Sequence, residues 1–253
     1  MKALRVAPFV AILFVWWLLT DVMDLYAPVI LPSPSATFRF VWSAAEQGDL
    51  LQAVWGSLSR FLYGLVIGAA LATPLGIVLA RNRRSSDVLM PFIKFFQAIA
   101  GVTWIPLAVL WFGISTRAAV FIIVNTTFFV VLYAVMTGIR TIPPVLLQAV
   151  RTLGGTLSTE VRHVLMPGAL PHVLTGVRIA VGYGWRALIA AEIISSGRGL
   201  GVMIWEGQQR LNTAQIFAAL ILIGLISFSM DRFLLRPIER ATVERWGLAT
   251  SKA

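Results

Sequence analysis

The sequence predicts an all-α membrane protein with six transmembrane helices, and two observations carry this prediction. First, 58% of its 253 residues are hydrophobic and only 13% are charged, against roughly 45–50% and about 25% in ordinary soluble domains. A soluble fold of this size could not bury so much apolar surface. Second, apolar segments of about 20 residues, the length needed to cross a hydrocarbon core, recur along the chain.

Six segments are long and apolar enough, or nearly so, to span a membrane: residues 6–25, 58–80, 88–112, 118–138, 173–194 and 214–235. Pro91 begins the third segment and Pro106 lies inside it, where a proline removes a backbone hydrogen bond and bends a helix. A broken helix at membrane depth is tolerated only where protein or a water-filled cavity satisfies the freed backbone groups. The bend therefore indicates either a packing kink or the lining of a solute pathway.

Basic residues favour one side of the predicted bundle. That side holds Lys2, Arg5, Arg81, Arg83, Arg84, Arg140, Arg151, Arg162, Arg236, Arg240, Arg245 and Lys252. The opposite connections hold few basic residues, and these are offset by acidic ones. Because cytoplasmic connections carry the excess of lysine and arginine, both termini are predicted to be cytoplasmic. The same rule accounts for the net charge of +10, which in a soluble protein would point to nucleic acid.

Catalytic and metal-binding residues are scarce. The chain has no cysteine and only two histidines, His163 and His172, so disulfides and thiolate metal sites are excluded. We expect no metal site and no enzyme, because no convergent set of nucleophile, base or metal ligands is visible. No glycine–lysine pair occurs, which excludes a P-loop for ATP phosphates. An ATP-driven function would therefore need a partner.

The connection formed by residues 140–171 is too polar to span a membrane, and it is predicted to form two short helices. Pro143-Pro144 can begin the first helix, because the first helical position lacks an internal hydrogen-bond partner anyway. Residues 145–153 continue it. Gly154-Gly155 ends it, since glycine accepts the left-handed geometry of a helix end.

A second short helix is predicted to follow this glycine turn. Thr156 or Ser158 can cap its beginning, and it extends through Val164. Pro167 and Pro171 are expected to end it and to begin the fifth span. A stiff pair of short helices could dock in a groove of another protein and transmit a rigid-body push, whereas a plain solvated loop would not need this geometry.

The same connection resembles a known motif. Gln148-Ala149-Val150, then Gly154, then Leu165-Met166-Pro167 is similar to the EAA motif in permease subunits of ATP-binding-cassette importers. Gln148 stands where the family has a glutamate, and Val150 stands where it has a second alanine. Further stretches resemble the nitrate/sulfonate/taurine/bicarbonate branch from about Leu31 to Arg240: LPSPSATF, TWIPLAVLWFG, WRALIAAEI and GRGLGVMIWEGQQRLNT.

The resemblance implies a type I importer permease in a bacterial inner (plasma) membrane. Residues 1–55 would form the first transmembrane helix and a periplasmic loop, 56–240 a five-helix permease core, and 241–253 a cytoplasmic tail. The implied partners are a second copy of the permease, two cytoplasmic ATPase subunits that bind ATP and magnesium, and a periplasmic or lipid-anchored solute-binding protein. A coupling helix between spans four and five would insert into the ATPase. The implied coupling-loop residues are Gln148, Ala149, Val150, Gly154, Gly155, Leu165 and Pro167.

Span five contains three ionisable residues, each of which costs at least about 2.5–3.5 kcal/mol at the centre of a membrane helix. Arg178, Trp185 and Glu192 are spaced by seven residues and share one stripe, while Arg186 lies near mid-span. Arg186 either offers charge-assisted hydrogen bonds to a passing anion or belongs to an internal ion pair. The candidate pathway residues are Trp104, Pro106, Arg178, Trp185, Arg186 and Glu192.

The stretch Gly197-Arg-Gly-Leu-Gly201 superficially suggests a phosphate loop, but it follows a membrane span and has no strand before it. A turn on the outer face, followed by a short interfacial helix around Trp205, is the better interpretation. The candidate contacts with a binding protein are Arg198, Gly199 and Gly201.

Two functions fit the whole chain. The first is the permease subunit of an importer for a small anionic solute such as a sulfonate, taurine, nitrate or bicarbonate; a small organic acid or a pyrimidine precursor of thiamine stays open. The second is a self-contained secondary transporter or channel, which a matching pair of inverted halves would favour. No clear repeat of that kind is visible in the sequence.

Overall fold

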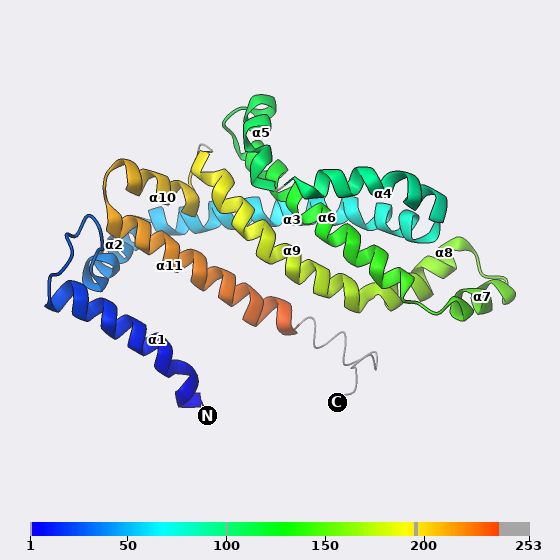
Figure 1. The fold of residues 1–253 in the computed structure, drawn as a ribbon, viewed down its shortest axis with the longest axis horizontal. Helices are drawn as coiled ribbons and strands as arrows, with labels where there is room; N and C mark the ends of the chain where they lie inside the picture. Colours follow the sequence, from blue (N-terminus) through cyan, green and yellow to red (C-terminus); the bar gives the residue numbers. More distant parts are fainter. Residues whose placement is uncertain (1, 100, 195–196, 238–253) are drawn as a thin grey trace. The chain divides into compact units, whose positions relative to one another are not determined.

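The computed structural model describes residues 2–99, 101–194 and 197–237, and within them every regular element is a helix (Figure 1). The chain divides into two compact units. The first unit comprises the chain up to Ser59 together with Glu192–Ile226, and the second comprises Arg60–Ala191 and the described residues from Ser227 onward. The predicted cytoplasmic tail, residues 241–253, lies outside the described residues, as do Arg240, Arg245 and Lys252.

The first unit is built from short helices around the beginning of α3. Its elements are α1 (Lys2–Trp17), the π-helix η1 (Leu18–Val22), α2 (Pro34–Glu46), the start of α3 (Asp49–Arg81), α10 (Leu200–Gln209) and most of α11 (Thr213–Ser229). Ser33 caps α2, because its hydroxyl accepts a hydrogen bond from the backbone N–H of Ala36 at 3.2 Å. The indole N–H of Trp16 donates to the carbonyl of Pro32 at 2.9 Å, which ties the end of α1 to the beginning of α2.

The second unit is a bundle around α6. Its elements are the rest of α3, α4 (Arg83–Ala98), the 3₁₀-helix η2 (Gly101–Trp104), α5 (Ile105–Phe112), α6 (Thr116–Arg140), α7 (Pro144–Thr152), α8 (Leu157–Glu160), the π-helix η3 (Val161–Leu165), α9 (Met166–Ile194) and the π-helix η4 (Met230–Leu235). Among its helices, α6 contributes the largest share of the core, including the fully buried Val131 and Leu132.

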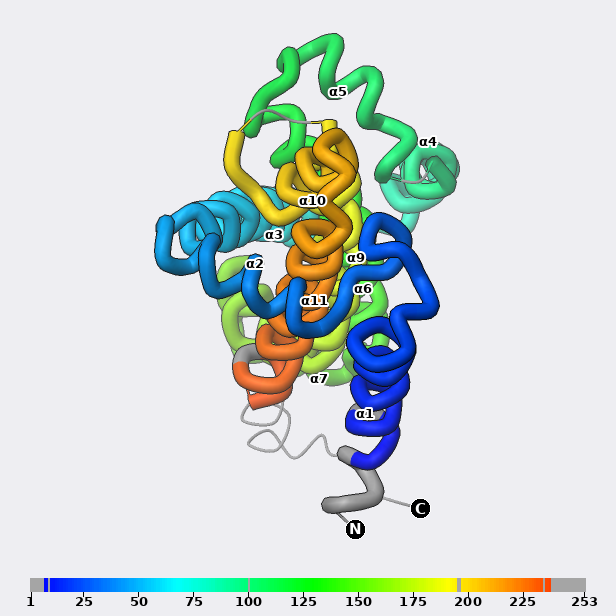
Figure 2. Tube along the Cα trace, turned by 90° about the vertical axis from the view of Figure 1, so that its left-hand side faces the viewer, coloured from blue at the N-terminus to red at the C-terminus, as the bar shows by residue number. Residues whose placement is uncertain are grey.

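Small residues allow the long helices of this unit to approach α6 closely. On α3, a Cβ added at Gly64 would come within 2.5 Å of Ile123. On α9, a Cβ added at Gly184 would come within 2.8 Å of Thr127. Figure 2 shows α6 and α9 beside one another in this packing.

Four helices are long and apolar enough to cross a membrane: Asp49–Arg81, Thr116–Arg140, Leu157–Ile194 and Thr213–Phe233. They contain the predicted second, fourth and fifth spans and most of the sixth. The predicted third span corresponds to the pair Arg83–Ala98 and Gly101–Phe112, which are bent by 85°. The predicted first span contains a shorter apolar helix, Val10–Val22. The number of six spans stays a prediction.

In the third predicted span, the helix does not begin at Pro91 and does not break at Pro106. Pro91 does not begin the helix, because α4 starts at Arg83 after Asn82, whose side chain accepts from the N–H of Ser85. The break comes before Pro106, which lies in the first turn of α5. A proline costs nothing there because that position has no internal hydrogen bond to lose.

The prolines of the fifth span were also misinterpreted. Pro167 and Pro171 neither end the second short helix nor begin the span, because Leu157–Ile194 is one continuous helix of 38 residues. The π-turn η3, in which the N–H of Met166 bonds the carbonyl of Val161, comes immediately before Pro167. The hydrogen bonds therefore change locally from the α-helical to the wider π-helical pattern next to Pro167, which leaves space for the proline ring. The helix continues through this point.

Candidate coupling segment and solute pathway

The predicted coupling segment, residues 144–160, consists of α7, a glycine turn and α8. Gly154 has φ +76°, a left-handed conformation that favours glycine. The N–H of Gly155 bonds the carbonyl of Val150 at 2.9 Å, and the N–H of Gly154 bonds the carbonyl of Arg151 at 3.0 Å. This pair of bonds is a Schellman motif. It closes α7 and fixes the direction in which the chain leaves.

The second helix of the segment begins at a cap. The hydroxyl of Thr156 accepts from the N–H of Thr159 at 3.4 Å, as one of the two caps predicted. Only the glycine turn and the capping Thr156 separate α7 from α8, which makes the segment a defined corner.

A buried carboxylate holds this corner to the rest of the second unit. The Glu160 side chain is 4% exposed, and its two oxygens lie 2.6 Å from Nη1 of Arg81 and 2.6 Å from Nε of Arg151. Arg81 is the last residue of α3, and Arg151 lies in α7. Glu160 therefore joins three helices. Hydrogen bonds from Arg151 and Arg81 hold the pKa of the Glu160 carboxyl, which precedes the predicted fifth span, below its usual range.

Sequence reasoning missed Glu160, although a signal was present. It is the only acidic residue between Asp87 and Glu192 in the sequence. A single carboxylate in a long stretch that contains several arginines is a good candidate for an ion pair, since a charge near apolar helices needs a partner.

The coupling segment exposes apolar side chains, with Leu153 at its tip. Leu153 is 88% exposed, Val145 63% and Leu157 61%, and Gln148 and Ala149 are also exposed. Large apolar side chains that cluster on a surface are typical of an interaction site. Of the other predicted coupling residues, Val150 and Pro167 are half-buried.

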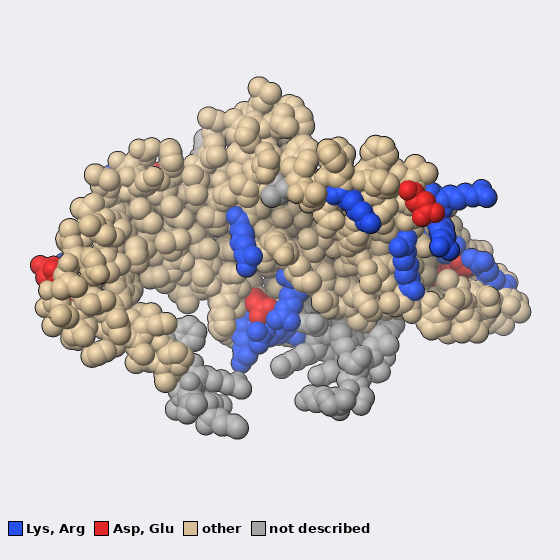
Figure 3. Space-filling model, viewed as in Figure 1, with Lys and Arg blue, Asp and Glu red and all other residues tan. Residues whose placement is uncertain are grey.

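Leu165 differs from the rest of the predicted set. It is fully buried and packs in the core cluster with Ile139, Ile142 and Ala169. It therefore supports the base of the segment and takes no part in the exposed tip. In Figure 3, basic side chains of the second unit gather over the end formed by α4, α7 and α8.

Two of the predicted pathway residues are occupied by internal contacts of the second unit. Nε of Arg178 lies 2.8 Å from Oδ1 of Asp231, and Nε of Arg236 lies 2.8 Å from Oδ2 of the same carboxylate. Trp185 is 3% exposed and packs edge-on against Phe61 with ring centroids 5.3 Å apart. The spacing of seven residues on α9 thus places both side chains among protein partners.

Glu192 belongs to the first unit and is fully buried there. Its carboxylate lies 2.8 and 2.9 Å from the hydroxyl of Ser57 and accepts from the N–H of Gly201 at 2.9 Å. The N–H of Leu200 bonds the Ser57 hydroxyl at 2.9 Å. The two side chains therefore satisfy N–H groups at the beginning of α10, where a negative charge is favourable.

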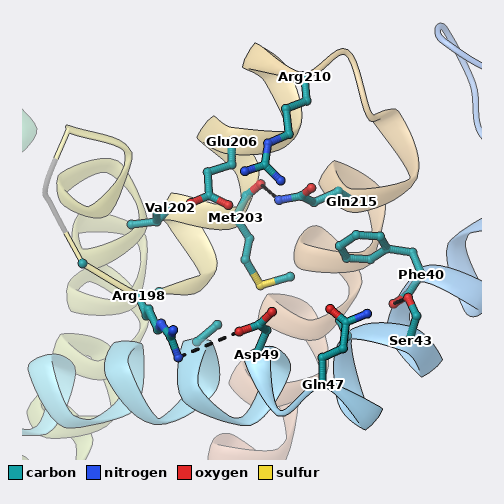
Figure 4. A pocket seen from close by; sticks show the side chains of 14 residues that line it. Phe40, Ser43, Gln47, Asp49, Arg198, Val202, Met203, Glu206, Arg210 and Gln215 are labelled. Atoms are coloured by element: carbon teal, nitrogen blue, oxygen red, sulfur yellow. Dashed lines mark hydrogen bonds and ion pairs between the residues drawn. The ribbon is translucent and has the colours of Figure 1, made fainter.

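The predicted binding-protein contacts surround this beginning of α10. Arg198 is exposed and lies 3.8 Å from Asp49, whereas Gly199 and Gly201 are buried. Figure 4 shows the neighbouring pocket of about 380 Å³, into which side chains of α2, α10 and α11 point. The predicted interfacial helix is α10, which contains Trp205.

Arg186 has a different environment from the other pathway candidates. It is exposed, and its guanidinium carbon lies 5.9 Å from the ring centroid of Tyr183. It lines a cavity of about 410 Å³ with Gln97, Asn125 and residues of the break between α4 and α5. Trp104 lies at this break between Phe96 and Phe121, and Pro106 is exposed just after it.

Comparison with known proteins decides the family. The model of the family described as "Binding-protein-dependent transport system inner membrane component" matches residues 72–236. The chain belongs to this family. It is thus the permease subunit of an ATP-binding-cassette importer, a membrane translocation subunit and not an enzyme.

Curated relatives align over most of the permease. It is 30% identical over 233 residues to the "Taurine transport system permease protein TauC" of Escherichia coli (strain K12), covering 90% of this chain and 84% of the relative. It is 35% identical over 231 residues to the "Putative aliphatic sulfonates transport permease protein SsuC" of the same strain, covering 90% and 88%. It is 36% identical over 191 residues to the "Bicarbonate transport system permease protein CmpB" of Synechococcus elongatus, covering 75% and 66%.

Solved structures confirm the fold of the permease. The MetNI methionine transporter in an inward-facing conformation aligns with a TM-score of 0.66 at 21% identity, covering 75% of this chain and 94% of that chain. An amino acid transporter solved with histidines aligns with a TM-score of 0.59 at 19% identity, covering 80% and 98%. The predicted type I importer fold is therefore confirmed.

Proposed function

We propose that this permease forms the pathway for a small anionic solute of the sulfonate, taurine, nitrate or bicarbonate type, and that ATPase subunits drive it through residues 144–160. The relatives named above support this solute class. The observation that carries the coupling role is the corner of α7 and α8, which exposes Leu153 at its tip and is held at its base by Glu160.

The corner has the properties that force transmission requires. A docked tip can move the bundle only if the segment does not bend, and the Schellman motif and the Glu160 ion pairs resist bending. The ion pairs reach α3 through Arg81 and α7 through Arg151, while Glu160 itself continues into α9. A push on Leu153 would therefore reach the ends of two long membrane helices together.

The partners follow from this role. We propose a homodimer of the permease with two ATPase subunits, which bind ATP and magnesium because this chain has no P-loop. A periplasmic or lipid-anchored solute-binding protein would contact the turn of Arg198, with Gly199 and Gly201 holding the backbone of that turn. When ATP closes the two ATPases, the corners move and the pathway opens toward the binding protein.

The orientation follows from charge. The basic end of the second unit, with Arg81, Arg83 and Arg140, would face the cytoplasm of a bacterial cell, with both termini on that side of the inner membrane. Residues 1–55 would then form the first helix and its periplasmic loop, and 56–240 the permease core. Among the predicted pathway residues, Arg186 lines the cavity, and Trp104 and Pro106 follow the break of the third span in the chain. We propose these three first as pathway residues.

Reconstitution in liposomes tests this function. The permease is purified with its ATP-binding subunit, and ATP hydrolysis and uptake of labelled taurine, nitrate and bicarbonate are measured with and without the solute-binding protein. We expect the binding protein to stimulate hydrolysis and uptake to require ATP. Uptake by liposomes that contain this chain alone would instead support the secondary transporter or channel.

A further inference from the structure

The cavity beside Arg186 is lined by side chains that can donate hydrogen bonds. Within the part of the chain that the structure describes, no hydrogen bond or ion pair engages the side chains of Arg186, Gln97 or Asn125, and the Tyr183 hydroxyl is likewise unbonded. Guanidinium, amide and phenol groups all donate hydrogen bonds. The cavity thus combines one full positive charge with several neutral donors.

An arginine at this position requires a water-filled or protein-covered surrounding. Arg186 lies near the middle of the predicted fifth span, and Asn125 lies within the fourth. A charged side chain that faced lipid there would be strongly unfavourable, so charges within spans face protein or water. No acidic side chain of the described residues neutralises Arg186. Its charge therefore remains available to an anion that enters the cavity.

The break in the third span opens onto the same cavity. Ile99, Gly101 and Val102 line it, and they join α4 to α5 where the two helices diverge by 85°. Gly101 is packed against the Thr126 hydroxyl, leaving no space for a Cβ. Irregular backbone at membrane depth is tolerated where it lines a cavity. Two independent features, an unneutralised arginine and a broken helix, thus meet at one place.

We propose that this cavity is a solute site that binds the oxyanion group of a small carboxylate, sulfonate, nitrate or bicarbonate, with Arg186 as the charged ligand. Asn125, Gln97 and the Tyr183 hydroxyl supply the neutral hydrogen bonds. The proposal rests on the proposed function, because it places selection for anions within the permease itself. Charge-assisted hydrogen bonds to a guanidinium are stronger than neutral ones, so removal of Arg186 should abolish the preference for anions.

Two further hollows of the second unit share lining residues in series with the cavity. A second hollow of about 580 Å³ shares Gln97 and Val130 with it, and a third of about 610 Å³ shares Tyr133 with the second. The third contains Lys94 and Arg140. Basic side chains thus line both the first and the third of these neighbouring hollows.

The absence of native cysteine allows a direct test. Val102 lines the cavity and is 47% exposed, so a Val102→Cys variant places a single thiol there. The intact complex with its ATPase subunits, in lipid nanodiscs, is treated with 2-sulfonatoethyl methanethiosulfonate (anionic) or its trimethylammonium analogue (cationic). Each labelling rate is divided by the rate of that reagent with free 2-mercaptoethanol, which removes intrinsic differences in reactivity.

We expect the anionic reagent to be favoured by about tenfold or more, since a nearby unit charge in a partly desolvated site attracts it strongly. Arg186→Gln should reduce this preference to about twofold or less, and Arg186→Lys should retain most of it. Arg117→Gln is the matched control, because Arg117 is an exposed arginine of the same unit that does not line the cavity, and it should leave the preference unchanged.

Three results would overturn the proposal: no labelling at position 102 by either reagent, equal normalised rates, or a preference that survives Arg186→Gln. The first would mean that lipid or the second copy covers the face. Binding-protein-stimulated ATP hydrolysis is measured on the same samples without the thiol reagents. Stimulated hydrolysis without an anion preference would reject this site and leave the proposed function standing; an anion preference without stimulated hydrolysis would do the reverse.

Discussion

Glu160 and Arg186 are both charged side chains on helices rich in apolar residues, but their surroundings in the second unit differ. Glu160 is 4% exposed and sits between Arg81 and Arg151 at 2.6 Å from each. Arg186 is exposed in a cavity without an acidic neighbour among the described residues. Breaking a neutralised, buried pair is costly, so it holds elements together. A charge without a counter-charge is available to a ligand.

The difference separates two tasks of the permease. Mutations at the paired charge or its corner should affect coupling to ATP hydrolysis. Mutations at the open charge should affect the solute and leave coupling intact. The following predictions test this separation from the largest expected effect to the smallest.

Gly154→Pro should abolish coupling. Proline holds φ near −65°, whereas Gly154 has φ +76° and its N–H closes the Schellman motif. We expect binding-protein-stimulated ATP hydrolysis to fall at least about tenfold, while insertion into the membrane is retained. Gly48→Pro is a matched control, because Gly48 has φ +78° and equally open surroundings in the first unit. Normal association of Gly154→Pro with the ATPase would count against the docking role.

Arg186→Gln should reduce uptake of an anionic solute by about tenfold while stimulated ATP hydrolysis remains within about twofold of the wild type. The expected pattern follows because the substitution removes a charge from the cavity and breaks no internal ion pair. Uptake and hydrolysis are measured in the same proteoliposomes. A parallel loss of both would show that Arg186 is structural and would remove the contrast with Glu160.

Glu160→Gln should weaken coupling by about threefold to tenfold without changing solute selectivity. The neutral amide leaves Arg81 and Arg151 without their common counter-charge, so α7 is held less firmly. Hydrogen exchange of the α7 backbone should increase in this variant. Glu206→Gln, which removes an exposed carboxylate of the first unit, should change neither quantity.

Mild acid should have the smallest effect. The folded pKa of Glu160 is lowered by its two arginine partners, so its contribution to stability is present above the usual carboxyl pKa and is lost as pH falls through the lowered folded value. We therefore expect protection of the α7 amides, after correction for intrinsic exchange, to be unchanged between pH 8 and pH 5. A loss of protection near pH 6 would show that the carboxyl has no such partners.

Hydropathy alone predicted much of the helical order, because apolar length and cytoplasmic arginines are strong signals in membrane proteins. The two-helix corner was also predictable, since Pro144, Gly154 and Thr156 act locally. The prolines led to wrong helix boundaries where neighbouring residues accommodate a proline within a helix. A cap at Asn82 lets α4 begin before Pro91, and the π-turn lets α9 continue through Pro167.

Contacts between distant residues were not accessible from the sequence. The pair of Arg178 and Asp231 joins residues 53 positions apart, and the bond between Ser57 and Glu192 joins residues 135 apart. No local pattern encodes such pairings, because they depend on how whole helices pack. For the same reason the spacing of Arg178, Trp185 and Arg186 could not reveal that Arg186 lines a cavity while the other two pack against protein partners.

Protection of a single thiol at the tip of the corner tests the central claim most directly. Leu153→Cys introduces the only cysteine of the chain at a position that is 88% exposed. Its labelling by a maleimide is followed in nanodiscs with and without a cysteine-free ATPase subunit. The account predicts at least about tenfold slower labelling when the ATPase is bound, since docking excludes solvent from the tip. Equal labelling rates in a complex shown to contain the ATPase would contradict it.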